Sequence, residues 1–430
     1  MNIDQLILYR NFAYEDLLRR LTEIFRGESE GRIGALPEDF ASAAHALVDL
    51  AGTHGFKGNL WHCLLALCLA NNENAYSQSC EIVGKVEGSL NELMLHDCRI
   101  LKQLFDLSPA MVDEAPEVAA VLTDYHPPKR ASRVYNQRVR DRILELSVAL
   151  EQAETPQAFK DIISEFYREF GVGRFGLHKA FSVKEGADGR AVIEPITRVE
   201  HIWFKDIVSY DDQKQQLKEN TEAFLQGIPA NNVLLFGDAG TGKSSCVKAV
   251  VNEYYDRGLR MIEVYKHQFR LLSDILEQVK DRNYKFIIYM DDLSFEDSEL
   301  EYKYLKAILE GGLGRRPDNV LIYATSNRRH LIRESFKDRD DLDEELHRRD
   351  TMQEKLSLSA RFGVTIYFGS PDKKLFQKIV LSLAERNGIH MSEERLLKEA
   401  NIWEISHGGL SGRTASQFII YLKALEAREA

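Results

Sequence analysis

The sequence has no long apolar run. Its longest purely apolar stretch lies near Leu64–Ala70, far short of the roughly 20 residues that a membrane-spanning helix needs. The chain begins with MNIDQLILYRNFAYEDLL, which carries an acid early and charges throughout, unlike a secretory signal. We therefore expect a soluble, cytoplasmic protein without a membrane segment.

Cysteine is scarce, and its spacing does not point to a metal. The chain has five cysteines and no CxxC pair, which argues against the zinc and redox motifs built on such pairs. The cysteines are Cys63, Cys68, Cys80, Cys98 and Cys246. His54 and His62 lie near two of them, but this spacing does not give a tetrahedral site from one helix. We expect core packing here and reduced, buried thiols of a cytosolic protein.

A surplus of basic residues is also missing. The 56 lysines and arginines face 67 acids, for a net charge of −11, which argues against attraction of nucleic acid by the whole surface. A local exception is residues 127–142, PPKRASRVYNQRVRDR, where six basic residues accompany one aspartate. The residues available to phosphates and bases there are Lys129, Arg130, Arg133, Arg140 and Tyr135. We favour a solvated helix face for this segment, with nucleic-acid binding as the alternative.

What the chain does contain is a change of pattern along its length. Residues 1–175 repeat apolar positions at intervals of three and four, which predicts a mostly helical N-terminal recognition region. In residues 176–200, two alternating runs flank a Gly-Ala-Asp-Gly turn, so we predict a hairpin that acts as a linker.

From residue 201 a different organisation is predicted. Continuous apolar runs separated by helices are typical of a parallel sheet covered on both faces. The runs are Asn232–Phe236, Met261–Tyr265, Phe286–Met290, Val320–Ala324 and Val364–Phe368. After Pro371 the pattern is helical to the end. The predicted fold is therefore an α/β core over residues 201–370 with a helical lid over residues 371–430.

One loop of this core carries a phosphate-binding motif. The segment GDAGTGKS follows the first apolar run and opens a helix, so it fits GxxxxGK[ST] in the required context. Its glycines let main-chain N–H groups point at phosphate oxygens. We expect Lys243 to reach the terminal phosphates and Ser244 to ligate Mg²⁺. The predicted nucleotide-binding residues are Gly237, Asp238, Ala239, Gly240, Thr241, Gly242, Lys243, Ser244 and Ser245.

Two further strands end in polar residues. FIIYMDDLSF places Asp291 and Asp292 at a strand tip, where one carboxylate can hold Mg²⁺ and the second can orient the attacking water. VLIYATSNRRHL ends a neighbouring strand and places Asn327 near the γ-phosphate. The structural alternatives are a strand-ending turn for the aspartates and an Asx turn or helix cap for Asn327.

The order of these motifs resembles that of AAA+ ATPases over about residues 200–430. FKDIVSYDDQKQQL resembles the first segment of that core, which implies that Ile207, Val208 and Ser209 lie against the adenine. SLSARFG resembles the segment that supplies an arginine finger to a neighbouring subunit, and Arg361 is the match. HGGLSGRTASQF resembles the sensor helix of the lid, with Arg413 in the sensing position. The resemblance thus implies ATP·Mg²⁺ bound between core and lid, in a homo-oligomer.

The chain shares longer blocks with an uncharacterised bacterial AAA+ family that has a helical N-terminal region. These blocks are ENTEAFLQGIPANNVLLFG, DDLSF, ATSNRRHLIRE and SLSARFG. One departure from AAA+ proteins in general is Asp292, which stands where glutamate is usual. Its shorter side chain predicts slow hydrolysis, unless Glu296 assists. Arg348 and Arg349 are alternatives to Arg361 as the finger.

The motifs do not identify the molecule on which such an ATPase would act. MIEVYKHQFRLLSDILEQV has no aromatic-glycine loop of the kind that threads polypeptides, and we expect Tyr265 and Phe269 to pack normally. The charged segment 333–355 is predicted to be an exposed helical insertion. We interpret the chain as an ATPase that drives remodelling or loading of an unknown macromolecular partner. The alternatives are a non-hydrolysing nucleotide switch or adaptor and, less favoured, a small-molecule kinase.

Overall fold

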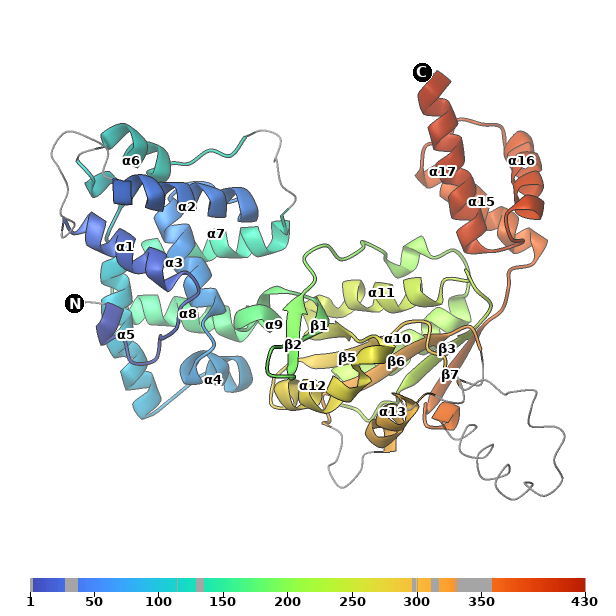
Figure 1. The fold of residues 1–430 in the computed structure, drawn as a ribbon, viewed down its shortest axis with the longest axis horizontal. Helices are drawn as coiled ribbons and strands as arrows, with labels where there is room; N and C mark the ends of the chain where they lie inside the picture. Colours follow the sequence, from blue (N-terminus) through green and yellow to red (C-terminus); the bar gives the residue numbers. More distant parts are fainter. Residues whose placement is uncertain are drawn as a thin grey trace. The chain divides into compact units, whose positions relative to one another are not determined.

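The computed structural model describes two compact units, Met1–His178 and Lys179–Ala430 (Figure 1). The residues it describes are 3–27, 38–113, 115–128, 135–295, 299, 301–310, 317–328, 331 and 358–429. Within these ranges, no helix has both the length and the apolar character that crossing a bilayer requires.

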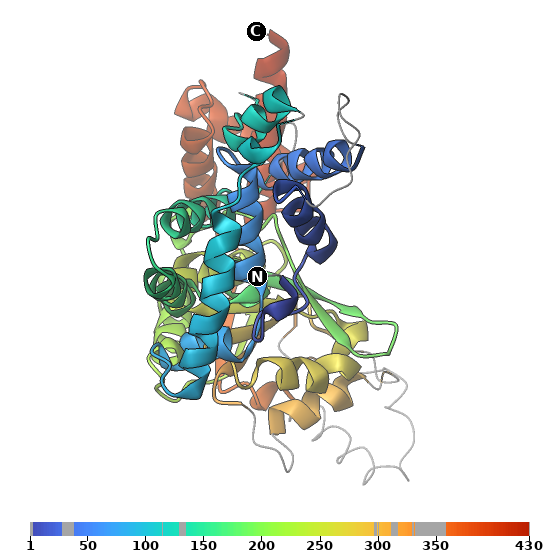
Figure 2. The same ribbon diagram turned by 90° about the vertical axis from the view of Figure 1, so that its left-hand side faces the viewer.

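The first unit is helical, as the sequence periodicity predicts (Figure 2). Its α-helices are α1 (Glu15–Phe25), α2 (Glu38–His54), α3 (Leu60–Asn71), α4 (Ala75–Val83), α5 (Ser89–Phe105), α6 (Pro116–Thr123), α7 (Gln137–Glu151), α8 (Pro156–Phe170) and α9 (Gly173–Leu177). Helix α3 contains the longest apolar run of the chain, and residues 60–70 are all buried. It begins at Asn59, whose side chain accepts hydrogen bonds from the first-turn amides. The longest apolar run therefore forms the buried central helix of this unit.

The second unit contains a seven-stranded sheet with the order β2-β1-β4-β5-β6-β3-β7. The strands are β1 (Ala180–Glu185), β2 (Ala191–Pro195), β3 (Val233–Gly237), β4 (Leu259–Glu263), β5 (Lys285–Met290), β6 (Val320–Ser326) and β7 (Val364–Phe368). All neighbours pair in parallel except β1 and β2. The predicted α/β fold with a mostly parallel sheet is confirmed, although β4 begins two residues before the predicted run.

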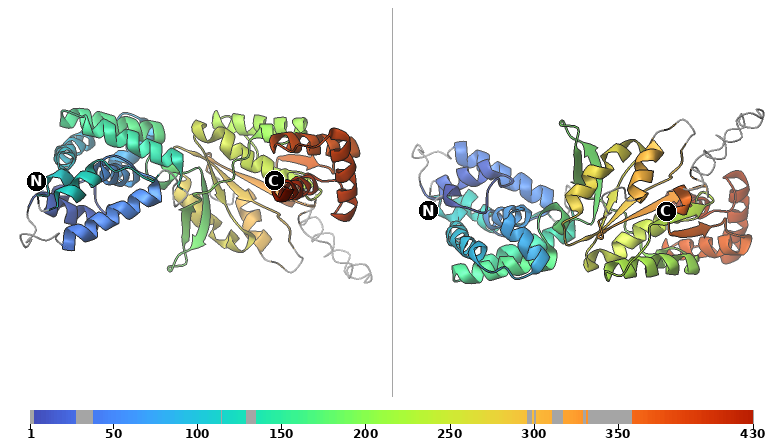
Figure 3. Two further views of the ribbon diagram at one scale, coloured as in Figure 1. Left: turned by 90° about the horizontal axis from the view of Figure 1, so that it is seen from above. Right: turned by 90° about the horizontal axis from the view of Figure 1, so that it is seen from below.

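Helices cover both faces of this sheet. They are α10 (Asp211–Leu225), α11 (Lys243–Tyr254), α12 (Leu272–Val279) and α13 (Glu301–Glu310). Apolar residues of α10 and α11 join those of the central strands in one buried cluster, and the ribbon views show α12 and α13 on the opposite side (Figure 3). The two-sided cover explains why the strands are continuous apolar runs rather than alternating ones.

The predicted hairpin is present, but it does not act as a linker. Strands β1 and β2 form the antiparallel pair, and a turn closes it at Gly186 and Gly189. Strand β1 also pairs in parallel with β4 over Ala180–Ser182, so the hairpin extends the sheet by two strands. The description of residues 176–200 as a linker therefore does not fit the strand pairing, and the boundary between the units lies after His178.

The chain ends in three helices with a small core of their own. They are α15 (Lys373–Arg386), α16 (Glu393–Ser406) and α17 (Gly412–Glu429). Phe376, Val380 and Phe418 are among the buried residues that hold them together. The hinge between β7 and α15 is short, and Asp372 caps α15 by accepting a hydrogen bond from Leu375 N at 2.8 Å. This helical group contacts the phosphate-loop motif.

Candidate functional site

A cleft of about 680 Å³ opens where the carboxyl ends of β3, β5 and β6 meet helices α15 and α17. Parallel strands end on one edge of a sheet, which is where α/β proteins place their ligand sites. The predicted site residues that line the cleft are Ile207, Val208, Ala239, Gly240, Thr241, Gly242, Lys243, Ser244, Ser245, Asp291, Asp292, Asn327 and Arg413. Gly237, Asp238 and Arg361 do not line it.

The phosphate-loop motif lies against the end of β7. Gly237 has a φ of +133°, and a Cβ at this position would lie 2.1 Å from the carbonyl oxygen of Phe368. The next amide, Asp238 N, donates to that same oxygen at 3.0 Å. Only glycine combines this backbone angle with such a close approach, so the first glycine of the motif anchors the loop to the sheet.

The Lys243 ammonium is buried beneath this loop. It donates to the carbonyl oxygens of Gly237 and Asp238 at 2.9 and 2.6 Å, and to Asn327 Oδ1 at 3.1 Å. Burial lowers the pKa of Lys243, and the carboxylates of Asp238 and Asp292 partly oppose this effect. A cation held in a desolvated position is well placed to bind an anion strongly.

Asp291 accepts hydrogen bonds from two hydroxyls. Ser244 Oγ donates to its Oδ1 at 2.7 Å and Thr325 Oγ1 donates to the same oxygen at 2.5 Å. Burial alone would raise the pKa of Asp291, but the hydrogen bonds from Thr325 and Ser244, together with the nearby Tyr289 hydroxyl, lower it. The carboxylate therefore stays ionised at neutral pH. Carboxylate and hydroxyl oxygens are the ligands that Mg²⁺ prefers, so these donors fit that cation.

Asp292 lies beside Asn327 at the rim of the cleft. Asn327 Nδ2 donates to Asp292 Oδ1 at 2.8 Å, while its Oδ1 accepts from Lys243. Asp292 also has a left-handed backbone, with a φ of +50°, and its amide donates to Thr325 Oγ1 at 2.9 Å. Asn327 thus connects the buried lysine to the second carboxylate.

The other end of the cleft is apolar. Ile207 packs against the cluster of the sheet and Val208 against the cluster of the C-terminal helices. Ile379 and Leu383 of α15 line the same region. Arg386 donates to the carbonyl oxygens of Lys205 and Asp206, both at 2.6 Å, which ties α15 to the segment before α10. An apolar slot of this kind suits a planar ring.

The start of α17 touches the phosphate loop directly. Arg413 N donates to the carbonyl oxygen of Gly240 at 3.3 Å. A Cβ on Gly240 would lie 3.0 Å from Ser411 Oγ and 3.1 Å from Arg413 Cβ. Arg413 therefore contributes its positive charge on the lid side of the cleft.

Arg361 lies near the amino-terminal ends of the parallel strands, opposite to the ends that form the cleft. It precedes β7, whose first residue, Val364, is in register with Val233 at the start of β3. The phosphate loop follows the far end of β3, and five strand residues span roughly 16 Å. Arg361 is therefore distant from the phosphate loop of its own chain.

Several residues of the site were not predicted from the sequence. Thr325 bonds to Asp291 and Asp292, and its signal was a hydroxyl two positions before Asn327, on the same face of the strand. Tyr210 donates to the carbonyl oxygen of Gly369 at 2.9 Å, and Ser370 donates twice to Asp238 at 2.8 Å. These contacts join segments far apart in the chain, and no local motif indicates them.

The structure describes only some of the residues on which the nucleic-acid alternative depends. Lys129, Arg130 and Arg133 lie outside the described residues, as do Glu296, Arg348, Arg349 and the segment 333–355. Arg140 is engaged, because it pairs with Asp141 at 2.6 Å and donates to the Tyr135 hydroxyl at 3.1 Å. Phe269 is buried as expected, whereas Tyr265 is 47% exposed, so the expectation of ordinary packing holds for only one of the two.

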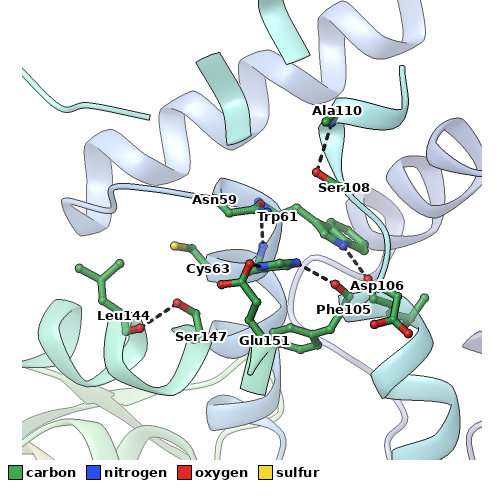
Figure 4. Close-up of polar contacts among 12 residues, drawn as sticks. Asn59, Trp61, Cys63, Phe105, Asp106, Ser108, Ala110, Leu144, Ser147 and Glu151 are labelled. Carbon is green, nitrogen blue, oxygen red and sulfur yellow. Dashed lines mark hydrogen bonds and ion pairs between the residues drawn. The ribbon is translucent and has the colours of Figure 1, made fainter. Parts of the chain in front are cut away.

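The four cysteines of the first unit and His62 are parts of its core. All five cysteines of the chain are free and buried. His62 Nε2 contacts the Phe105 carbonyl oxygen at 2.8 Å, and its Nδ1 lies 3.5 Å from Glu151. Figure 4 shows Cys63, Phe105 and Glu151 around this position. Within the described ranges, no three His, Cys, Asp or Glu side chains form a metal-binding group.

Comparison with known families and proteins finds similarity mainly over the second unit. A family model described as "Protein of unknown function (DUF815)" matches residues 177–426. The replication factor C large subunit of Staphylothermus marinus is 41% identical over 71 residues, which cover 16% of this chain and 16% of that protein. Proteasome-activating nucleotidase 1 of Haloferax volcanii is 23% identical over 214 residues, which cover 42% of this chain and 52% of that protein.

The similarity thus spans about half the length of the nucleotidase and less of the replication factor. Among solved structures, a RuvB variant of Thermotoga maritima is 13% identical, with a TM-score of 0.39, over 53% of this chain and 67% of that one. PCH-2 of C. elegans is 18% identical, with a TM-score of 0.36.

Proposed function

This chain belongs to the family described as protein of unknown function (DUF815), and we propose that its AAA+ core binds ATP with Mg²⁺ and hydrolyses ATP to ADP and phosphate. The observation that carries this proposal is the shared cleft. Lys243, Asp291, Asn327 and Arg413 come from four separate elements, and all four line one cavity. A purely structural glycine-rich turn would not need cations, carboxylates and an apolar slot around one space.

The residues of the cleft divide the proposed work. Main-chain amides of residues 239–245 and the Lys243 ammonium would bind the phosphates. Ser244 uses its proton toward Asp291, which leaves its oxygen lone pairs available to a cation. Bound Mg²⁺ would neutralise charge on the phosphate oxygens. Ile207 and Val208 would hold the adenine between the sheet and α15.

Asp292 and Asn327 would position the attacking water. Asn327 holds one oxygen of the Asp292 carboxylate at 2.8 Å, which leaves the second oxygen available to a water. Aspartate reaches less far than glutamate, and a misplacement of about 1 Å can cost roughly a hundredfold in rate. We therefore expect measurable but slow hydrolysis.

The two arginines have different proposed roles. Arg413 would bind the terminal phosphate from the lid, so that loss of this phosphate changes the lid position. Arg361 is distant from the phosphate loop of its own chain, which supports a role in the site of a neighbouring subunit, where a guanidinium can neutralise transition-state charge. This role requires a homo-oligomer.

Phosphate release tests the main proposal. Purified protein with ATP and Mg²⁺ should release phosphate without any acceptor, and Lys243→Ala should abolish nucleotide binding measured by calorimetry. Lys280→Ala is a matched control, because Lys280 is an exposed lysine paired with Glu277 at the end of α12. Wild-type turnover by Lys243→Ala would contradict the assignment. Phosphate release that depends on a small-molecule acceptor would favour the kinase alternative.

Mixing of two inactive variants tests the role of Arg361. Lys243→Ala lacks its own site but can donate Arg361, whereas Arg361→Ala keeps its site but lacks the finger. If the finger acts between subunits, mixed oligomers should regain part of the wild-type phosphate release. No recovery in oligomers that contain both chains, as verified by tagged co-purification, would contradict the role in a neighbouring site.

A nucleotide switch without hydrolysis is the second candidate function. Aspartate in the place of the usual glutamate favours it, because a carboxylate on the shorter side chain of Asp292 reaches less far toward the attacking water. A single-turnover experiment with assembled protein separates the two functions. ATP recovered intact after hours, with ATP and ADP bound at different affinities, would favour the switch.

The partner that this cycle would remodel or load is a macromolecule of unidentified type. We propose that the helical first unit recognises it. The variant Asp292→Asn should bind ATP without hydrolysis and hold the partner for identification by pull-down. Binding of single- and double-stranded DNA at low and moderate salt tests the nucleic-acid alternative, because phosphate contacts weaken steeply with salt.

A further inference from the structure

The tyrosine in the strand that leads to Asp291 has an unsatisfied hydroxyl. Tyr289 lies on β5, is only 2% exposed, and its hydroxyl has no hydrogen-bond partner within the part of the chain that the structure describes. Side chains two positions apart in a strand point to the same face, so Tyr289 and Asp291 share one side of the sheet. A buried hydroxyl without a partner is costly, and such groups are rare unless a water or ion serves them.

The neighbouring strand shows how such a hydroxyl is normally satisfied. Tyr323 on β6 is in direct register with Tyr289 and belongs to the same buried cluster. Its hydroxyl bonds to Thr221 at 2.8 Å and to Asn220 at 3.1 Å. The two tyrosines therefore differ in their polar surroundings. Tyr323 bonds to Thr221 and Asn220 of α10, whereas the Tyr289 hydroxyl lies close enough to Asp291 to interact with it.

Asp291, next to the Tyr289 hydroxyl, has a carboxylate oxygen that accepts no hydrogen bond from a described residue. The two hydroxyls that bond to Asp291 both use Oδ1, and Oδ2 has no hydrogen bond to a described residue. Tyr289 and Asp291 are close enough that each shifts the pKa of the other. Burial raises the pKa of Tyr289, so the phenol keeps its proton and acts as a donor. The Tyr289 hydroxyl makes no well-formed hydrogen bond to a described residue, so its proton is available to a further partner beside Asp291.

We propose that the Tyr289 hydroxyl hydrogen-bonds a water of the Mg²⁺ coordination shell and so positions the cation at Asp291. Mg²⁺ usually keeps several of its waters and is held by one or two carboxylates. Partners outside the ligand shell that orient those waters and carboxylates contribute to metal affinity. This inference rests on the proposed binding of ATP with Mg²⁺, and it makes Tyr289 a positioning residue rather than a catalytic one.

The test compares Tyr289→Phe with the matched control Tyr323→Phe. For each protein, ADP binding is measured by calorimetry without Mg²⁺ and over a series of Mg²⁺ concentrations, and stability is measured by urea denaturation without nucleotide. Tyr289→Phe should bind ADP normally without Mg²⁺ but need roughly tenfold more Mg²⁺ for its half-maximal effect. Its denaturation midpoint should not fall, because the hydroxyl has no partner to lose.

Tyr323→Phe should behave in the opposite way. Its Mg²⁺ dependence should equal that of the wild type, and its denaturation midpoint should fall because Thr221 and Asn220 lose a partner. Unchanged Mg²⁺ dependence in Tyr289→Phe would overturn the inference and leave the proposed function intact. A wild-type protein that binds no nucleotide would overturn the proposed function, and the inference with it.

Discussion

Gly237 is the position where backbone conformation matters most for the phosphate loop. An alanine there would need a φ of +133° and would bring its Cβ within 2.1 Å of Phe368 O. We expect Gly237→Ala to lose about 3 kcal/mol or more of unfolding free energy in urea denaturation. Gly258 is the control, since its φ is +87° but its surroundings are open, and Gly258→Ala should lose only about 1–2 kcal/mol. Equal losses would contradict the close approach to β7.

The buried cysteines predict how the protein responds to thiol reagents and to pH. Burial raises the pKa of Cys63 and of Cys246 to about 12, and it also raises the pKa of Cys68, Cys80 and Cys98. The thiolate is the reactive form. Ellman's reagent should therefore react slowly with native protein at pH 8 and rapidly with all five thiols in guanidinium chloride.

The same shifts fix the direction of the pH effect on stability. In the unfolded chain the thiols ionise near pH 8.5, whereas Cys63 and Cys246 in the folded protein hold their protons to about pH 12. The unfolded state therefore binds fewer protons between these values, and stability should fall as the pH rises through this window. Rapid labelling of the native protein at pH 8 would contradict the burial of these residues.

At the scale of elements, the hinge before α15 joins the phosphate loop to the lid. Ser370 donates its amide and its hydroxyl to Asp238, both at 2.8 Å. Hydrogen bonds from Ser370 lower the pKa of Asp238, so this link persists at neutral pH and is lost as the pH falls through the lowered pKa. A change in the loop on phosphate binding would thus reach the start of α15 through one side chain.

Amide hydrogen exchange can test this link. In Asp238→Ala, exchange of the Ser370 amide should accelerate roughly tenfold or more, because a bond to a charged acceptor is lost. Asp372→Ala is the matched control, since it removes the cap bond to Leu375 N at the same helix, and should cost about 1 kcal/mol of α15 stability. It should speed exchange at Leu375 and leave Ser370 unchanged. Identical exchange of Ser370 in both variants would contradict a specific role of Asp238.

At the scale of the whole molecule, the chain divides into two compact units. One cluster of buried apolar residues runs from Ile3 to Leu177 in the first unit, and the clusters of the sheet and the lid lie in the second. A ligand of the second unit should therefore stabilise that unit alone. ADP with Mg²⁺ at a hundred times its dissociation constant should add about 2.7 kcal/mol.

This prediction is checked by hydrogen exchange with and without nucleotide. Amides of β5 in the second unit should gain protection, whereas those of α3 in the first unit should not change. The variant Lys243→Ala should show no gain in either unit. Equal gains in β5 and α3 would mean that the two units unfold together.

Features that lie in contiguous residues are predictable from the amino-acid sequence. The GDAGTGKS loop, the aspartates after FIIYM and the helical periodicity of the first unit are recognisable because a turn, a strand end or an amphipathic face depends on neighbours in the chain. The residues of the phosphate loop and of the strand ends that line the cleft were named on this basis, whereas Ile207, Val208 and Arg413 were named from the family resemblance. Their roles in catalysis stay predictions.

Contacts between groups that are distant in the sequence become visible in the folded chain alone. Strand order brings Thr325 to Asp291 and leaves Tyr289 with an open hydroxyl, and the path of the chain brings Ser370 to Asp238 across 132 positions. The turn of the β1–β2 hairpin is a local feature, but the hairpin is part of the sheet because β1 pairs with the distant strand β4. Contacts of this kind depend on topology and packing. Because many segments of the chain together determine the topology and the packing, no short sequence pattern predicts these contacts.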